Sequence, residues 1–530
     1  MKLARSLAVL LIAATSGSAS STGSLRPSPA QRYSNLIIRS LPDISIISIN
    51  SSPVYNYSYP AIPSSNTPVS GVDFCNVTII LDHRRANDSV LVTVWLPFKG
   101  WNGRFQATGG GGLAAGLFEP ELAPAVAAGY ATAGTDGGLT LGGTIDANSG
   151  LWVLGSDGTP RAELVKNFAY RSQHDLAIVG KAVTKQFYGT SPKYSYWNGC
   201  STGGRQGYFA AQKYPGDFDG ILASAPALNT PQLSVADFWP SVVMANLVAP
   251  PKCVFEAYQA NIILTCDPLD GVKDGLISNT KKCNLDTQGL IGHIITCDSG
   301  NLTITQEHAH TVSKILQGAT SLSGNKQWYG IPPGASFNGL ANTSTTNGTT
   351  IPVPFSSAEA WIRYFVMQDP DYDTAHMTFK EFDNAFSASI AKYSGILGTN
   401  EPDLTVFYKR GGKLLTWHGL ADPLITHEGT VRYRERLEQR MGGQKKVDEF
   451  YRLFLAPGVA HCGGGIGPAP LDPLHALVEW VESGKAPVTL GATGVDSNGT
   501  TLTRNLCRYP LLLTYDGKGD INNADSYSCV

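Results

Sequence analysis

The stretch NGCSTGGRQG, residues 198–207, contains the arrangement G-x-S-x-G at residues 199–203. Glycines on both sides of Ser201 let the backbone turn sharply from a strand into a helix, which leaves the serine oxygen exposed. Glycine supplies 57 of the 530 residues, so a match of this kind arises easily by chance. The role of Ser201 therefore depends on the elements around it and on suitable partners elsewhere in the chain.

Apolar segments on both sides of this turn alternate between strand and helix patterns. Strands are predicted at residues 90–97, 129–138, 193–198, 219–227, 413–419 and 449–457, and helices at 172–187, 203–214 and 471–483. This alternation predicts a parallel α/β sheet. A serine turn between a strand and a helix of such a sheet is typical of the α/β-hydrolase fold.

The strand and helix rhythm is interrupted by a long insertion. Residues 229–393 consist of cysteine-bearing loops, irregular helices and a polar stretch, and we interpret them as a large lid. The catalytic domain is then predicted to comprise residues 21–228 and 394–530. Residues 1–20 have the positive start, short apolar core and small-residue end of a secretory signal peptide.

An acid and a histidine follow Ser201 in the order that this fold requires, each just beyond an apolar strand. Asp422 follows the strand at 413–419, and His461 follows the strand at 449–457. His418 and His427 also lie near Asp422, as surface groups or as supporting partners.

The cysteines strengthen this assignment. Cys200 directly precedes Ser201 and Cys462 directly follows His461, so a disulfide between them would hold nucleophile and base together. We therefore expect a Ser201, Asp422, His461 triad that forms an acyl-enzyme.

The oxyanion of that reaction needs backbone donors. We expect the N–H of Thr202 and an N–H of the glycine run 109–112, at Gly111, to supply them. Phosphate binding by the glycine run is disfavoured, because no Lys-Ser/Thr pair follows it.

A second cluster lies within the lid, where CDPLDGVKDGLIS (266–278) places three aspartates on a glycine-containing loop. Such a loop suits a structural calcium ion, bound by Asp267, Asp270 and Asp274 with the carbonyls of Val272 and Leu276. On the residues alone, a solvated acidic turn explains the pattern equally well.

Composition excludes several classes of partner and indicates the compartment. With a formal net charge of -2 and 15% charged residues, the chain has no electrostatic reason to bind nucleic acid or an anionic membrane. Nine cysteines, none spaced as a CxxC pair, suit disulfides in an oxidising compartment. Secretion is also favoured by N-glycosylation sequons, at Asn56, Asn76, Asn87, Asn301, Asn342, Asn347 and Asn498.

At this level of detail the sequence resembles the tannase and feruloyl esterase family. The resemblance covers residues 70–530 and rests on WNGRFQATGGGG (101–112), YWNGCSTGGRQG (196–207), FDGILASAPA (218–227), CDPLDGVKDG (266–275), HGLADPLI (418–425) and GVAHCGGG (458–465). It implies the α/β-hydrolase fold with a lid, the triad and the Cys200–Cys462 disulfide. It also implies bound calcium. With the resemblance taken into account, we therefore expect the loop at 267–276 to be a metal site rather than a solvated acidic turn.

The resemblance extends to the remaining cysteines. It leads us to expect the pairs Cys266–Cys283 and Cys507–Cys529, with Cys253 and Cys297 left over as a third pair. Family members usually carry an N-terminal cysteine that pairs with the position of Cys75. Residues 21–74 contain none, so Cys75 is expected to be free.

The resulting hypothesis is a secreted serine esterase, without an organic cofactor, acting on small or polysaccharide-linked esters of ferulic, p-coumaric, caffeic or gallic acid. A feruloyl esterase is favoured over a tannase. Alternatives are an esterase for a secondary metabolite, a serine peptidase, and a non-catalytic binding protein. Lid aromatics either stack on the substrate or form the lid core, at Tyr329, Phe337, Phe355, Trp361 and Tyr364. Oligomeric state is not predicted.

Overall fold

The computed structural model describes residues 36, 38, 41, 43–61, 68–496 and 499–530. The predicted signal peptide, residues 1–20, and the sequon at Asn498 lie outside these residues. No helix of the described part of the chain is both long enough and apolar enough to cross a membrane.

A nine-stranded sheet forms the centre of the molecule, in the order β1-β2-β3-β5-β4-β6-β7-β12-β13. The six strands from β5 to β13 pair in parallel, whereas β1, β2, β3 and β5 pair antiparallel. The prediction of a parallel sheet is therefore correct for the strands around Ser201 and wrong for the N-terminal ones. The strands are β1 (Ile44–Tyr59), β2 (Val69–His83), β3 (Val90–Pro97), β4 (Arg104–Thr108), β5 (Ala131–Thr135), β6 (Tyr194–Cys200), β7 (Gly220–Ser224), β12 (Lys413–Gly419) and β13 (Tyr451–Ala456).

The two long N-terminal strands lie in a region that the sequence left unassigned. β1 forms one edge of the sheet, and its serines, asparagine and tyrosines leave most of its residues exposed or half-buried. β2 buries one face, with Val77, Ile79 and Leu81 fully covered. An edge strand that buries so little carries a weak apolar signal, which explains why it was missed.

Helices cover both faces of the sheet because neighbouring residues on a strand point in opposite directions. Trp197 packs in the core formed with α4, α5 and α13, whereas Tyr196 packs in the core that contains α15. The helices around the sheet are α2 (Glu119–Ala127), α3 (Ala162–Lys166), α4 (Ser172–Tyr188), α5 (Thr202–Lys213), α13 (His427–Met441), α14 (Gln444–Val447) and α15 (Pro473–Ser483). The chain ends in short strands, β14 (Ala469–Pro470), β15 (Thr489–Val495), β16 (Thr501–Cys507), β17 (Leu513–Tyr515) and β18 (Tyr527–Cys529).

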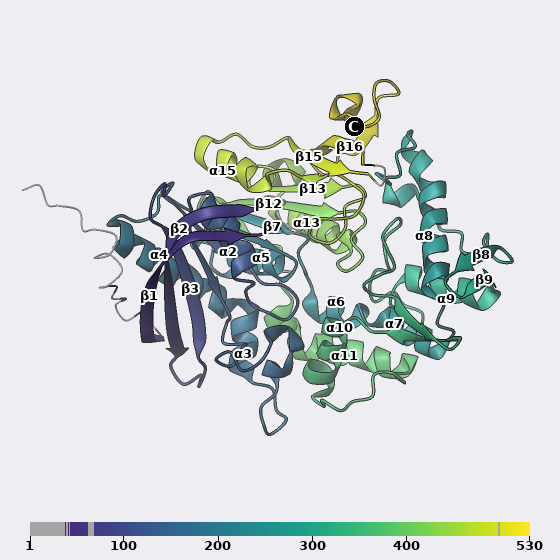
Figure 1. Ribbon diagram of the computed structural model, residues 1–530, viewed down its shortest axis with the longest axis horizontal. Coiled ribbons are helices and arrows are strands. Elements are labelled where there is room, and N and C mark those ends of the chain that lie inside the picture. The colour runs from purple at the N-terminus through teal and green to yellow at the C-terminus, as the bar shows by residue number, and fades with distance from the viewer. Residues whose placement is uncertain (1–35, 37, 39–40, 42, 62–67, 497–498) are drawn as a thin grey trace, which may run out of the picture.

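Between β7 and β12 the described chain adds no strand to the main sheet. Helices of this segment gather on the right of Figure 1, in teal and green, away from the purple strands β1 to β3. They share a core around Trp239, Trp361 and Phe365. The elements are α6 (Thr230–Ala236), α7 (Trp239–Asn246), α8 (Lys252–Cys266), β8 (Ile294–Cys297), β9 (Gly300–Thr303), α9 (Gln306–Gln317), β10 (Asn342–Thr346), β11 (Thr349–Val353), α10 (Ser356–Ala360), α11 (Phe379–Leu397) and α12 (Thr405–Lys409). The expected lid boundary at residue 393 falls inside α11.

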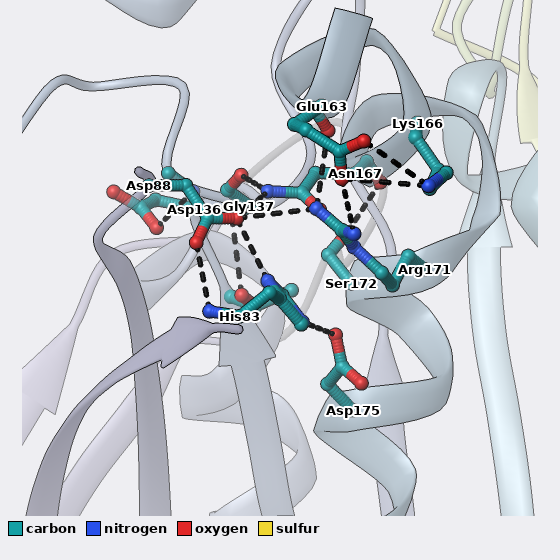
Figure 2. Close-up of polar contacts among 12 residues, drawn as sticks. His83, Asp88, Asp136, Gly137, Glu163, Lys166, Asn167, Arg171, Ser172 and Asp175 are labelled. Atoms are coloured by element: carbon teal, nitrogen blue, oxygen red, sulfur yellow. Dashed lines mark hydrogen bonds and ion pairs between the residues drawn. The ribbon is translucent and has the colours of Figure 1, made fainter. Parts of the chain in front are cut away.

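A buried polar cluster ties the end of β2 to α4, as Figure 2 shows. His83 Nδ1 lies 2.7 Å from Asp88 Oδ2, and His83 Nε2 lies 2.8 Å from Asp175 Oδ2. Arg171 contacts the same Asp88 oxygen at 3.2 Å. Burial by itself would lower the pKa of His83, but the hydrogen bonds with Asp175 and Asp88 outweigh it and raise the pKa to about 9.

This cluster predicts a stability that depends on pH. His83 holds its proton more tightly in the folded chain, so its contribution is present below pH 6.5 and is lost as the pH rises through about 9. His83→Gln should cost about 2 to 4 kcal/mol near pH 6, because it leaves the buried Asp175 without its cationic partner and Asp88 with Arg171 alone. Melting temperatures at pH 6 and pH 9 should differ less for the variant than for the wild type.

The matched control is His376→Gln. His376 also pairs with an aspartate, Asp373, at 2.6 Å, but its side chain is 87% exposed. This substitution should leave the melting temperature and its pH dependence unchanged. An equal effect of the two substitutions would contradict the role of the buried cluster.

Candidate active site

Ser201 lies on a sharp turn between β6 and α5. Its backbone has φ 62° and ψ -121°, a strained conformation for a residue with a side chain. Its N–H donates to the carbonyl of Ser224 at 3.1 Å, and its carbonyl accepts from the N–H of Ala227 at 3.1 Å. Contacts with the neighbouring strand and the loop after it therefore maintain the turn.

Glycine is required where the turn meets the 109–112 loop. A Cβ atom at Gly199 would lie 2.7 Å from the Gly203 carbonyl carbon, and one at Gly109 would lie 2.4 Å from the Gly203 Cα. Such distances are too short for any side chain. The glycines of the quoted stretch thus serve close backbone packing as well as the turn itself.

The acid and the histidine meet at hydrogen-bond distance. His461 Nδ1 lies 2.8 Å from Asp422 Oδ2, and Asp422 Oδ1 accepts from the N–H groups of Leu424 and Ile425 at 2.9 and 3.0 Å. Burial alone would raise the pKa of Asp422, but the His461 charge and the hydrogen bonds from His418 and His461 hold it well below its usual range. Asp422 therefore carries a negative charge that can orient the His461 ring and stabilise its protonated form.

His418 is a buried partner of Asp422 that the sequence left undecided. Its Nε2 lies 2.8 Å from the Ile425 carbonyl and 3.3 Å from Asp422 Oδ2. A carbonyl only accepts, so Nε2 carries a proton, and Nδ1 lies 2.9 Å from the Thr430 hydroxyl oxygen. His427 is also buried, but its Nε2 lies 3.3 Å from the Thr280 hydroxyl oxygen.

The disulfide Cys200–Cys462 joins the serine turn to the histidine loop, with the two Cα atoms 5.9 Å apart and a sequence separation of 262. The other pairs are Cys253–Cys297, Cys266–Cys283 and Cys507–Cys529. Cys75 is a free thiol, fully buried in β2. The disulfide pattern expected from the sequence is therefore present, the free cysteine included.

A cavity of about 340 Å³ opens above these residues. Ser201 and His461 line it together with the glycine run, and residues of α6 and α10 contribute walls from the lid. Of the five lid aromatics, only Phe355 lines this cavity. Phe337 stacks on Phe255, and Trp361 stacks on Phe365, so these residues belong to the lid core.

The glycine run presents backbone donors to this cavity. The Gly110 N–H is taken by the Gln206 side chain at 2.9 Å, and the Gly109 N–H by the Asn198 carbonyl at 3.1 Å. In the part of the chain that the structure describes, the N–H groups of Gly111 and Thr202 have no such partner. They remain available as the expected oxyanion donors. Gln206, which holds the loop, was not predicted, because nothing local marks its distant partner.

The aspartates of the 267–274 loop mainly receive backbone hydrogen bonds. Asp267 accepts from the N–H groups of Asp274 and Gly275, and Asp274 pairs with Arg504 at 2.6 Å. Burial, with the charges of Asp274 and Asp270 adding to it, raises the pKa of Asp267. Crowded buried carboxylates are the donor chemistry that calcium prefers.

The aspartate side chains of this loop are not gathered around one point in the structure. Across the described residues, no three His, Cys, Asp or Glu side chains come together closely enough to hold a metal ion. Calcium binding would require the three carboxylates to turn inward from their present contacts.

Residues 75–530 match the family described as "Tannase and feruloyl esterase". The chain belongs to this family. A "Probable feruloyl esterase" of Arthroderma benhamiae is 48% identical over 477 residues, covering 89% of this chain and 88% of that protein. Members of the family are carboxylic ester hydrolases, and so is this protein.

Solved structures of the family share the fold. The tannin acyl hydrolase from Aspergillus niger superposes with a TM-score of 0.85 at 27% identity, covering 95% of this chain and 94% of that one. Feruloyl esterase B from Aspergillus oryzae gives a TM-score of 0.77 at 29% identity, covering 93% and 98%. The predicted family and the α/β-hydrolase fold class are thereby confirmed.

The disulfide beside the triad generates a prediction. Replacing Cys200 and Cys462 by alanine should lower kcat for a small aryl ester at least about tenfold, because small displacements of base and nucleophile are costly. The fold, followed by circular dichroism, should persist.

The Cys507–Cys529 pair provides the control, since it joins two C-terminal strands, β16 and β18, and does not involve the serine turn. Its double alanine variant should keep the wild-type kcat. Equal losses of kcat in both variants would show that the Cys200–Cys462 bond has no special role in positioning.

Proposed function

We propose that the protein is a serine esterase that cleaves esters of hydroxycinnamic acids, as a feruloyl esterase rather than a tannase. One observation carries this proposal: Ser201 and the Asp422-bound His461 line the same largely apolar cavity. Its volume of about 340 Å³ accommodates a single aromatic acyl group. The family to which the chain belongs supports the same class of substrate.

The chemistry follows from the three residues. His461 Nε2, on the ring edge opposite Asp422, would take the proton of Ser201 as its oxygen attacks the ester carbonyl. The N–H groups of Gly111 and Thr202 would stabilise the oxyanion. His461 would then protonate the leaving alcohol, and a water molecule activated by the same nitrogen would release the acid from the acyl-enzyme.

The walls of the cavity favour a hydroxycinnamoyl over a galloyl group. Phe168, Leu233, Leu424 and Phe355 present apolar surface to it. Gallate carries three ring hydroxyls, each of which loses hydrogen bonds to water and needs a replacement partner. A ferulate ring has one hydroxyl and one methoxy group, so it needs fewer replacement hydrogen-bond partners from these apolar walls.

We also propose that the protein is secreted and that calcium stabilises its lid. Four disulfides among the described residues suit an oxidising compartment. Calcium would be held by Asp267, Asp270 and Asp274 with the carbonyls of Val272 and Leu276, where it would offset the repulsion of neighbouring carboxylates. The ion lies outside the proposed reaction and takes part in no step of it.

The substrate proposal is tested with methyl ferulate, methyl caffeate, methyl p-coumarate and methyl gallate. Hydroxycinnamate esters should give kcat/KM values at least about tenfold above gallate. Ser201→Ala should lower every rate by about a thousandfold or more while keeping the melting temperature, because it removes the nucleophile. Turnover of gallate alone would make the protein a tannase, and undiminished turnover by the variant would refute the triad.

The calcium proposal is tested by thermal unfolding. Chelator-treated protein should gain melting temperature when calcium is added at about millimolar concentration, and magnesium should not substitute for it. Asp270→Asn should reduce this gain, because it removes one charged ligand. If the melting temperature of the wild type does not change when calcium is added, the site is refuted.

A further inference from the structure

A carboxyl group from the lid reaches the candidate catalytic cavity. Thr230, Leu233, Ser234 and Asp237 all line this cavity. Their spacing of three, four and seven residues from Thr230 places them on one face of α6 and its C-terminal end. Asp237 is therefore presented to the same space as Ser201 and His461.

The Asp237 carboxyl is unpaired within the described part of the chain. No hydrogen bond or ion pair to this side chain occurs among the described residues, although the residue is only 9% exposed. The accessible part faces the cavity. Burial, and then the negative charge of Asp422, raise the pKa of Asp237 well above its ordinary value. Burial thus favours the protonated form of the carboxyl, in which one oxygen can donate a hydrogen bond and the other can accept one.

An unpaired carboxyl among apolar walls has an energetic cost. A buried polar group without a hydrogen bond is destabilising, and an apolar residue at this position would remove the cost. A ligand that brings a hydroxyl into the cavity removes it as well. Asp237 differs here from Asp422, because both oxygens of Asp422 have partners: His461, His418 and two backbone N–H groups.

We propose that Asp237 is a specificity-determining residue whose carboxyl pairs with a free phenolic hydroxyl on the aromatic ring of the acyl group. The inference rests on the proposed function. The carbonyl oxygen of the acid accepts from the phenol, and its O–H donates to the phenol oxygen or to a neighbouring ring oxygen. An acyl group whose ring hydroxyls are all methylated offers no donor and leaves the carbonyl oxygen unpaired.

A neutral acid is better suited to this task than an ionised one. A second negative charge in the cavity would repel Asp422 and would oppose the oxyanion that forms at Ser201. The other carboxyl that lines the cavity, Glu121 of α2, has a pKa raised to about 7 by burial. It belongs to α2 rather than to the lid, which makes it a matched comparison for Asp237.

The test compares methyl ferulate with methyl 3,4-dimethoxycinnamate, which differ only in methylation of the ring 4-hydroxyl. The readout is the ratio of the two kcat/KM values within one protein, so a general loss of activity cancels. Asp237→Leu should lower this ratio at least about tenfold, since the site loses its recognition of the hydroxyl. Asp237→Asn, also neutral and able to donate and accept, should keep the ratio within about threefold of the wild type.

Three results would overturn the inference. They are an unchanged ratio in Asp237→Leu, an equal loss in Asp237→Asn, and an equal loss in the control Glu121→Leu. If the wild type hydrolyses neither ester, the proposed function fails separately. Calorimetric binding of the same two esters to the wild type and to Asp237→Leu then decides the inference, with the same change of preference expected in affinity.

Discussion

The close approach of two glycine-containing backbones is the constraint on which the candidate active site depends. The serine turn after β6 and the 109–112 loop after β4 come so near that a Cβ atom at Gly109 would lie 2.4 Å from the Gly203 Cα, and one at Gly203 would lie 3.2 Å from the Gly109 Cα. Gln206 then fastens the loop, accepting from the Gly110 N–H and donating to the Ala115 carbonyl at 3.1 Å. The loop is held in this way at residues that line the cavity, and among the described residues the N–H groups of Gly111 and Gly112 have no hydrogen-bond partner.

The carboxyl groups at and behind the cavity differ in their hydrogen-bond partners. Asp422 is completely buried, yet two histidines and two backbone N–H groups satisfy it. The lid contributes a different carboxyl, Asp237, which has no hydrogen-bond partner among the described residues and whose pKa is raised by burial. The site thus combines a fixed negative charge behind His461 with walls that carry little charge, which suits an uncharged aromatic ester.

Features encoded locally were predictable from the sequence, and features created by distant contacts were not. The serine turn, the strands that end at Asp422 and His461, and the cysteines beside the triad are each visible in short stretches. The edge strand β1 buries too little apolar surface to give a pattern. Asp237 and His418 were overlooked or left open because their meaning depends on the lid and the sheet meeting in space. Four of the five suggested lid aromatics proved to lie away from the cavity, since aromatic content alone does not separate a wall from a core.

The Cys200–Cys462 bond also changes the covalent topology of the chain. It closes a ring that contains the whole segment from the serine turn to the histidine loop, with the lid inside it. A protease that cuts one peptide bond anywhere in this ring produces two chain segments that stay covalently joined. An enzyme exposed to foreign proteases can therefore be nicked in its lid without shedding a fragment, and its nucleophile and base remain parts of one molecule.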